Sequence, residues 1–142
     1  MPHITNKMEH GPLTFDCGVD TIIGGRLVEL KADGTIKHTT AGTKKFVGVA
    51  TDDAKPLAGQ AVDGYNVTAS IMRSETAVGF RGVWRLEYSA AAACGDWLIA
   101  DTDGKVRPYT AGTTTFDQII GRCVEPGGVL INKRGRTLLT IG

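Results

Sequence analysis

Histidine and cysteine are the residues of this chain best suited to nucleophilic or acid–base chemistry, and both are scarce. A hydrolytic triad needs a nucleophile beside a base and a third group that orients the base. His3 and His10 lie in a polar segment near the start of the chain, where no core would fix their rings, and His38 lies in a short threonine-rich run. We therefore expect no catalytic residue and no enzyme activity, with His38 an ordinary strand residue.

The cysteines do not form a recognisable redox or metal motif. They are odd in number and lack C-x-x-C spacing, which predicts neither a disulfide framework nor a zinc cluster. Small buried thiols are the expectation for all three, Cys17, Cys94 and Cys123.

Metal and phosphate sites have little support in the sequence. Asp52 and Asp53 are adjacent, and adjacent strand residues point to opposite faces, which disfavours a shared cation. Ile23–Arg26 has two glycines but neither G-x-G-x-x-G spacing nor a following helix. We expect no metal and no cofactor.

Charge and hydropathy exclude two further classes of partner. The chain has 16 basic and 15 acidic side chains, a formal net charge of +1, and no run of about 20 apolar residues. We expect no nucleic-acid partner and no membrane association. The one basic cluster, Asn132–Arg136, is expected to be an exposed hairpin turn or a salt-bridged rim.

Short runs rich in Val, Ile and Thr alternate with turn residues, which predicts short β-strands. Any functional residues must therefore be positioned by these strands and the turns between them. The 19 glycines are about twice the average share and suit many tight turns. Asp33-Gly34 and Asp103-Gly104 each separate two such runs and predict hairpin tips with type I′ turns. Strands are predicted near 21–30, 35–40, 46–50, 65–72, 78–88, 97–100, 105–109, 118–124 and 137–141.

The two predicted hairpins resemble each other. Asp33–Thr43 aligns with Asp103–Thr113 without a gap, at an offset of 70 residues, and both segments end in Thr-Ala-Gly-Thr. After three extra residues in the second copy, Phe46–Ala50 aligns with Ile119–Cys123. We predict an all-β fold, a pseudo-symmetric β-barrel or β-sandwich built from a duplicated hairpin unit.

The copies are expected to span about residues 17–50 and 94–124, opened by Cys17-Gly18 and Cys94-Gly95. Residues 1–16 are mostly polar and predict an extended N-terminal arm, with a single β domain over 17–142. Such an arm could add a strand to the sheet edge of a neighbour.

Candidate interface residues come from the arm and from the basic cluster. They are Ile4, Met8, Leu13, Phe15, Arg134 and Arg136. Three large aromatic side chains, Trp84, Tyr88 and Trp97, could anchor an interface or fill the core.

The order of motifs in the second copy resembles a known family. Cys94–Asp101 is followed by Asp103–Arg107, Thr110–Thr113 and Ile119–Cys123. This order is similar to the small β-rich decoration, or head cement, proteins of tailed bacteriophages, in which an Ala-Gly-Asp, strand, Asp-Gly-Lys-Val and Ile-Gly-x-Ala pattern recurs. The similarity covers about residues 17–124, and the chain departs from the family in its polar arm and its basic cluster.

The resemblance implies a structural virion protein without catalytic residues. It would be made in the host cytoplasm, form a homotrimer, and sit on the capsid exterior near threefold or quasi-threefold axes. There it would stabilise the viral capsid by clamping neighbouring copies of the major capsid protein. Two alternatives remain open: another virion component, such as a tail or fibre module, or a carbohydrate-binding β module.

Overall fold

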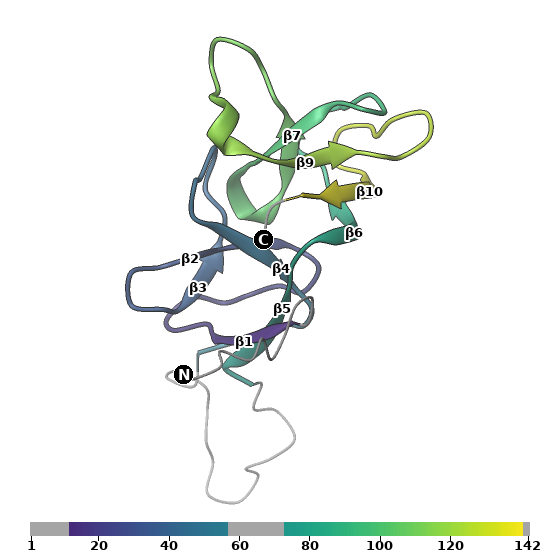
Figure 1. Cartoon of the computed structure of the whole chain (residues 1–142). Helices are drawn as coiled ribbons and strands as arrows, with labels where there is room; N and C mark the ends of the chain where they lie inside the picture. The colour runs from purple at the N-terminus through teal and green to yellow at the C-terminus, as the bar shows by residue number, and fades with distance from the viewer. Residues whose placement is uncertain (1–11, 57–72, 141–142) are drawn as a thin grey trace, which may run out of the picture.

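The computed structural model describes residues 12–56 and 73–140, which form two antiparallel sheets of five strands each (Figure 1). The first sheet has the order β1-β5-β4-β2-β3 and the second has the order β6-β10-β9-β7-β8. The first contains β1 (Leu13–Asp16), β2 (Leu27–Leu30), β3 (Ile36–His38), β4 (Phe46–Ala50) and β5 (Glu75–Gly79). The second contains β6 (Gly82–Glu87), β7 (Trp97–Ala100), β8 (Val106–Pro108), β9 (Ile119–Cys123) and β10 (Arg134–Leu139).

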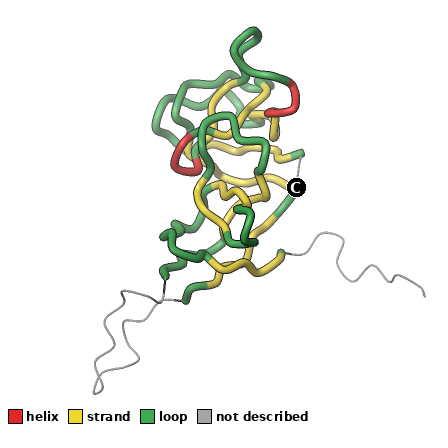
Figure 2. Tube along the Cα trace, turned by 90° about the vertical axis from the view of Figure 1, so that its left-hand side faces the viewer, coloured by secondary structure: helices red, strands yellow, loops and turns green. Residues whose placement is uncertain are grey.

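Helical structure in the described residues is limited to two short 3₁₀ turns, η1 (Thr102–Gly104) and η2 (Phe116–Gln118). Figure 2 shows them as short red segments in a trace of strands and long loops. This architecture confirms the predicted all-β fold class.

The two sheets follow the same pairing plan. Adding five to each strand number of the first sheet gives the order of the second. Leu30 lies opposite Ile36 in β2–β3, and Ala100 lies opposite Val106 in β7–β8, each 70 residues later. A register irregularity also falls at matching places, after Val28 in β2 and after Leu98 in β7. We call β1–β5 the first half and β6–β10 the second half.

Glycines in the central strand of each sheet allow neighbouring strands to approach closely. A Cβ at Gly48 in β4 would lie 2.1 Å from the carbonyl oxygen of Gly79, and one at Gly121 in β9 would lie 2.2 Å from that of Leu138. Backbone oxygens cannot move aside as a flexible side chain can, so only glycine fits at these two equivalent positions.

The two halves share part of their hydrophobic core. One cluster belongs to the first half: Cys17, Ile22, Val28, Ile36, Ala50, Ala54 and Val78. The other cluster fills the second half, but it also includes Leu27 of β2 and Val49 of β4. Leu27 and Val49 are buried on the opposite face of the first sheet from Val28 and Ala50, so this sheet is covered on both faces where the halves meet.

Several predicted strand boundaries were wrong. The strand expected over 21–30 begins only at Leu27, because Ile22 forms an isolated bridge with Ala54. The strand expected over 78–88 is two strands, β5 and β6, since the chain passes from one sheet to the other between Gly79 and Gly82. The strand expected over 65–72 lies outside the described residues.

The predicted end of the N-terminal arm, residue 16, was wrong. Its last four residues form β1, the edge strand of the first sheet, in which Leu13 lies opposite Val78 and Phe15 opposite Thr76. The remaining part up to residue 11 lies outside the described residues, so that part stays a prediction.

Local turn geometry corrects two other expectations. Asp103 and Gly104 both have positive φ (58° and 72°), as a type I′ turn requires, but at the first tip only Gly34 does, at 86°. Gly95 matches Gly25 at the same offset of 70, so Cys94 occupies the position of Gly24 rather than that of Cys17.

Only part of the basic cluster forms a turn, because Asn132 and Lys133 lie in the turn Leu130–Lys133. Arg134 and Arg136 lie on β10, and the turn before them is closed by the N–H of Lys133 donating to the carbonyl of Leu130. Asn132 adopts positive φ in this turn.

Candidate interaction surface at the junction of the halves

A loop of the first half is held by strand ends of the second half. We call Thr40–Thr43, which has the sequence Thr-Ala-Gly-Thr, the first loop. The N–H of Gly42 donates to the carbonyl of Ala100 at 2.9 Å, and Nε2 of Gln118 donates to the carbonyl of Gly42, also at 2.9 Å. The first loop is therefore clamped between the end of β7 and η2, the turn that precedes β9.

Neighbouring contacts strengthen this junction. The hydroxyl of Thr39, just before the first loop, donates to the carbonyl of Asp101 at 2.7 Å. Just after the loop, the ammonium of Lys44 lies 2.7 Å from the carboxylate of Asp117. Both side chains of this ion pair are more than half exposed, so it contributes little stability to the junction.

The hairpin tip of the second half packs on β2. A Cβ at Gly104 would lie 2.7 Å from the Cβ of Arg26 and 2.7 Å from the carbonyl oxygen of Leu27. Arg26 donates to the carbonyl of Asp103 at 3.2 Å and approaches the Glu87 carboxylate at 3.4 Å. The two halves are thus joined by close backbone packing as well as by the shared core.

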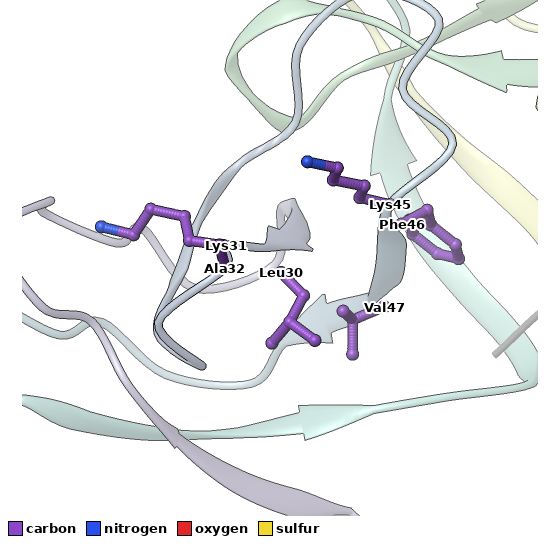
Figure 3. Close-up of a pocket in the computed structure, with 6 residues that line it drawn as sticks. All are labelled: Leu30, Lys31, Ala32, Lys45, Phe46 and Val47. Carbon is purple, nitrogen blue, oxygen red and sulfur yellow. The ribbon is translucent and has the colours of Figure 1, made fainter.

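A pocket lies at the corresponding hairpin tip of the first half. It has a volume of about 470 Å³ and is lined by Leu30, Lys31, Ala32, Lys45, Phe46 and Val47 (Figure 3). Leu30 and Val47 form an apolar side, while the ammonium groups of Lys31 and Lys45 extend away from it. Lys31 pairs with Asp20 at 2.8 Å, which raises the pKa of Lys31 above its ordinary value. The pocket has an apolar floor and a basic rim, and it contains no arrangement typical of catalysis.

The outer face of the second sheet presents aromatic and basic side chains. Trp97 is 44% exposed, and the guanidinium carbon of Arg122 lies 3.9 Å from the centre of its ring. Arg122 lies opposite both Trp97 and Leu138, and Leu138 lies opposite Val83, so the four residues form a row across the sheet. Tryptophan and arginine are enriched at protein interfaces.

A second aromatic pair lies beside η2. Phe116 is 80% exposed and stacks on Tyr109 with ring centroids 5.6 Å apart. The N–H of Tyr109 donates to the carbonyl of Trp97 at 2.7 Å, which places this pair next to the outer face.

The candidate interface residues do not gather at one place. Leu13 and Phe15 lie in β1 at the edge of the first sheet, whereas Arg134 and Arg136 lie in β10 of the second. The Glu125 carboxylate accepts from the backbone N–H and Nε of Arg136, and these bonds lower the pKa of Glu125. Ile4 and Met8 lie outside the described residues.

Of the three large aromatic candidates, only Trp97 is exposed. Trp84 packs against the shared core and donates Nε1–H to the carbonyl of Phe80, and Tyr88 is fully buried with its hydroxyl 2.7 Å from that of Thr137. Burial raises the pKa of Tyr88 well above its ordinary value. The pocket, Arg122 and Phe116 were not identified from the sequence.

His38 has a structural role in the described residues. Its Nδ1 lies 3.2 Å from the carbonyl of Leu27, and its Nε2 accepts from the N–H of Ile23 at 2.9 Å. Both ring nitrogens are thereby engaged in a neutral tautomer, and burial lowers the pKa of His38.

Cysteine exposure corrects one expectation. Cys17 and Cys123 are buried, as expected, but Cys94 is exposed because it lies in the loop before Gly95 rather than in a strand. Within the described ranges, no three His, Cys, Asp or Glu side chains gather as a metal site would need, and no helix is long and apolar enough to cross a membrane.

Comparison with known proteins gives a structural match without a sequence match. No protein-family model matches the chain, and no curated protein is significantly similar to it. A solved structure described as "The crystal structure of head fiber gp8.5 N base in bacteriophage phi29" superposes with a TM-score of 0.59 at 16% sequence identity. The match covers 91% of this chain and 92% of that chain, so the two share their fold over almost their full length.

Proposed function

We propose that the chain is a structural virion protein that decorates the outer surface of a phage capsid and stabilises it by clamping neighbouring major capsid subunits. The observation that carries this proposal is the fold shared, over 91% of the chain, with the base of a phage head fiber. The motif order after Cys94, which resembles that of head decoration proteins, supports the same class independently.

The surface chemistry suits attachment rather than turnover. The described residues offer an exposed Trp97–Arg122 row, an exposed Phe116 and a pocket with a basic rim, which are features of protein interfaces. A clamp gains avidity when several modest contacts act together, so a homotrimer without an enzymatic site would serve this role. We also infer that the two halves are copies of one five-strand unit, since their pairing registers match.

The test is to locate the protein on virions. Antibodies raised against the recombinant protein would be applied to purified particles from the phage that encodes it, with gold labelling read by electron microscopy. Label distributed over the head supports the proposal. Particles that lack the protein by mass spectrometry would refute it.

A second candidate is the base of a fibre attached to the virion, favoured by the description of the structural neighbour. The same labelling separates the two roles, because a fibre base would be labelled at a few fixed points and a decoration protein over the whole shell.

The candidate arm residues Ile4 and Met8 remain part of the proposal. Deleting residues 1–11 leaves β1 intact, so the variant should keep its β fold and bind stripped capsids more weakly. Unchanged capsid binding would remove the arm from the proposed interface.

A further inference from the structure

The tetrapeptide Thr-Ala-Gly-Thr occurs twice, in two different environments. The first loop, Thr40–Thr43, is clamped by the second half. The second loop, Thr110–Thr113, has the same four residues, and all four are exposed. Gly42 and Gly112 both have positive φ, 67° and 90°, so the loops also share this backbone feature.

Space around the two glycines shows that one loop is docked and the other is open. A Cβ at Gly42 would lie 2.8 Å from Nε2 of Gln118, whereas a Cβ at Gly112 would meet nothing within 4 Å. The chain therefore has a built receptor for this tetrapeptide in its second half, and a second copy of the tetrapeptide that stands free of any receptor in the described structure.

The first half contains the counterpart of that receptor. The first loop is held by Ala100 and Gln118. Comparison of the pairing registers of the two sheets shows that Leu30 is the equivalent of Ala100, and that Phe46 is the equivalent of Ile119. Lys45, which precedes Phe46, is therefore the equivalent of Gln118. Leu30 and Lys45 both line the pocket of about 470 Å³. The pocket of the first half is thus equivalent in position to the site in the second half where the first loop is bound.

We propose that the second loop of one copy of this chain docks in the Leu30–Lys45 pocket of another copy. The contact would repeat between molecules the clamp that joins the two halves within one molecule. It is heterologous, because loop and pocket are different surfaces, so it generates a closed ring or an open chain of copies.

An ion pair lies beside the clamped loop, and the rim of the pocket is basic. Within one chain, Lys44 follows the first loop and pairs with Asp117, which precedes the receptor residue Gln118. Lys31 and Lys45 form the rim of the pocket, and Lys31 already pairs with Asp20. The contact between copies therefore depends on the fit of loop and pocket rather than on a new ion pair.

Exposed aromatic side chains flank the second loop. Phe116 is 80% exposed and stacks on Tyr109, the residue immediately before the loop. The carbonyl of Trp97 accepts a hydrogen bond from the N–H of Tyr109, and the Trp97 side chain is 44% exposed. Docking of the second loop would cover this apolar surface. The inference supplies a surface for the self-association in the proposed function, but it requires no capsid, so failure to assemble and failure to bind capsids are separate results.

Two blocked variants test the contact on the full chain. Ala111→Arg obstructs the second loop, and Ala32→Trp fills the pocket; both positions are exposed, so the β fold should survive, as circular dichroism would verify. Val19→Arg, at an 84% exposed position outside both surfaces, is the matched control. Mass is measured by light scattering over a concentration series.

The expected result is that wild type and Val19→Arg form oligomers, that each blocked variant is monomeric, and that an equal mixture of the two blocked variants forms a dimer and nothing larger. The dimer arises because the Ala32→Trp variant keeps an intact second loop and the Ala111→Arg variant keeps an intact pocket. A monomeric wild type, oligomers in both blocked variants, or a mixture that stays monomeric would each overturn the proposal. Should Ala111→Arg misfold, Phe116→Ser serves on the loop side, where it is expected to raise the concentration for half-assembly about tenfold.

Discussion

Replacing Gly42 by alanine, with Gly112→Ala as its matched partner, measures the strength of the junction between the halves. The two glycines occupy the same place in identical tetrapeptides and both have positive φ, so an alanine at either costs about 1–2 kcal/mol of left-handed strain. Only at Gly42 does the new methyl group also meet a neighbour, Nε2 of Gln118, at 2.8 Å. The difference between the variants therefore isolates the clamp.

The additional cost at Gly42 follows from the bonds of Gln118. Its side chain can rotate away from a Cβ, but it then loses its hydrogen bond to the Gly42 carbonyl and the one that its Oε1 accepts from the N–H of Thr115, at 3.0 Å. Each such bond contributes about 0.5–1.5 kcal/mol net. Gly42→Ala should thus be less stable than Gly112→Ala by about 1–2 kcal/mol, near the lower end because the loop is partly exposed.

Urea unfolding followed by circular dichroism is the assay, at a protein concentration where all variants are monomeric, so that assembly does not shift the midpoint. The free energies of unfolding of the two variants are compared directly, and strain common to both cancels. Equal destabilisation of Gly42→Ala and Gly112→Ala, or a larger loss at Gly112, would show that the first loop is not clamped as described and would refute the reasoning.

Three further predictions follow from buried or exposed polar groups. Tyr88→Phe should lower the free energy of unfolding by about 1–3 kcal/mol, because it leaves the buried Thr137 hydroxyl without its 2.7 Å partner; unchanged urea midpoints would contradict this. The folded-state pKa of His38 is lowered, so its contribution to stability is present above the unfolded pKa of about 6.5 and is lost as the pH falls through the folded pKa. The acid-side slope should be smaller in His38→Gln, and identical stability–pH curves would argue against the neutral ring that accepts from Ile23. Cys94 should react rapidly with a thiol reagent while the other two cysteines react only on unfolding; two or three fast thiols would count against the described burial.

The parts of the fold that depend on local chemistry could be predicted from the sequence. Asp-Gly at each hairpin tip identified β2–β3 and β7–β8, because a tight turn is encoded by the residues within it. β1 was missed because its four residues pair with β5, about 60 positions away, and nothing local distinguishes them from an arm. The change of sheet at Phe80 was missed although Gly79 and Gly82 flank it, because the β-rich residues on either side predict a single strand.

The candidate site was less accessible to sequence reasoning, for a physical reason. Thr-Ala-Gly-Thr is identical in both loops, so the sequence shows a repeat but not that one loop is clamped and the other free. That difference arises from what lies across the junction, Ala100 and Gln118, and from the absence of an equivalent neighbour beside Gly112. Only the pairing registers reveal that the pocket at Leu30 is the counterpart of the filled receptor.

Two further equivalent pairs show how the halves have diverged. Leu27 and Val49 are buried in the shared core, and the registers place Trp97 and Arg122 at the same positions of the second half, where both are exposed. A leucine and a valine suit a permanent contact, since they have no polar group to keep hydrated. Tryptophan beneath an arginine guanidinium, 3.9 Å from its ring, suits a surface that must stay soluble alone and still bury area when a partner arrives. In the first half this face is buried in the shared core, whereas in the second half it has the residue types of a contact that forms between separate molecules. Trp97 and Arg122, which stand in place of Leu27 and Val49, lie beside the second loop, because the carbonyl of Trp97 accepts from the N–H of Tyr109.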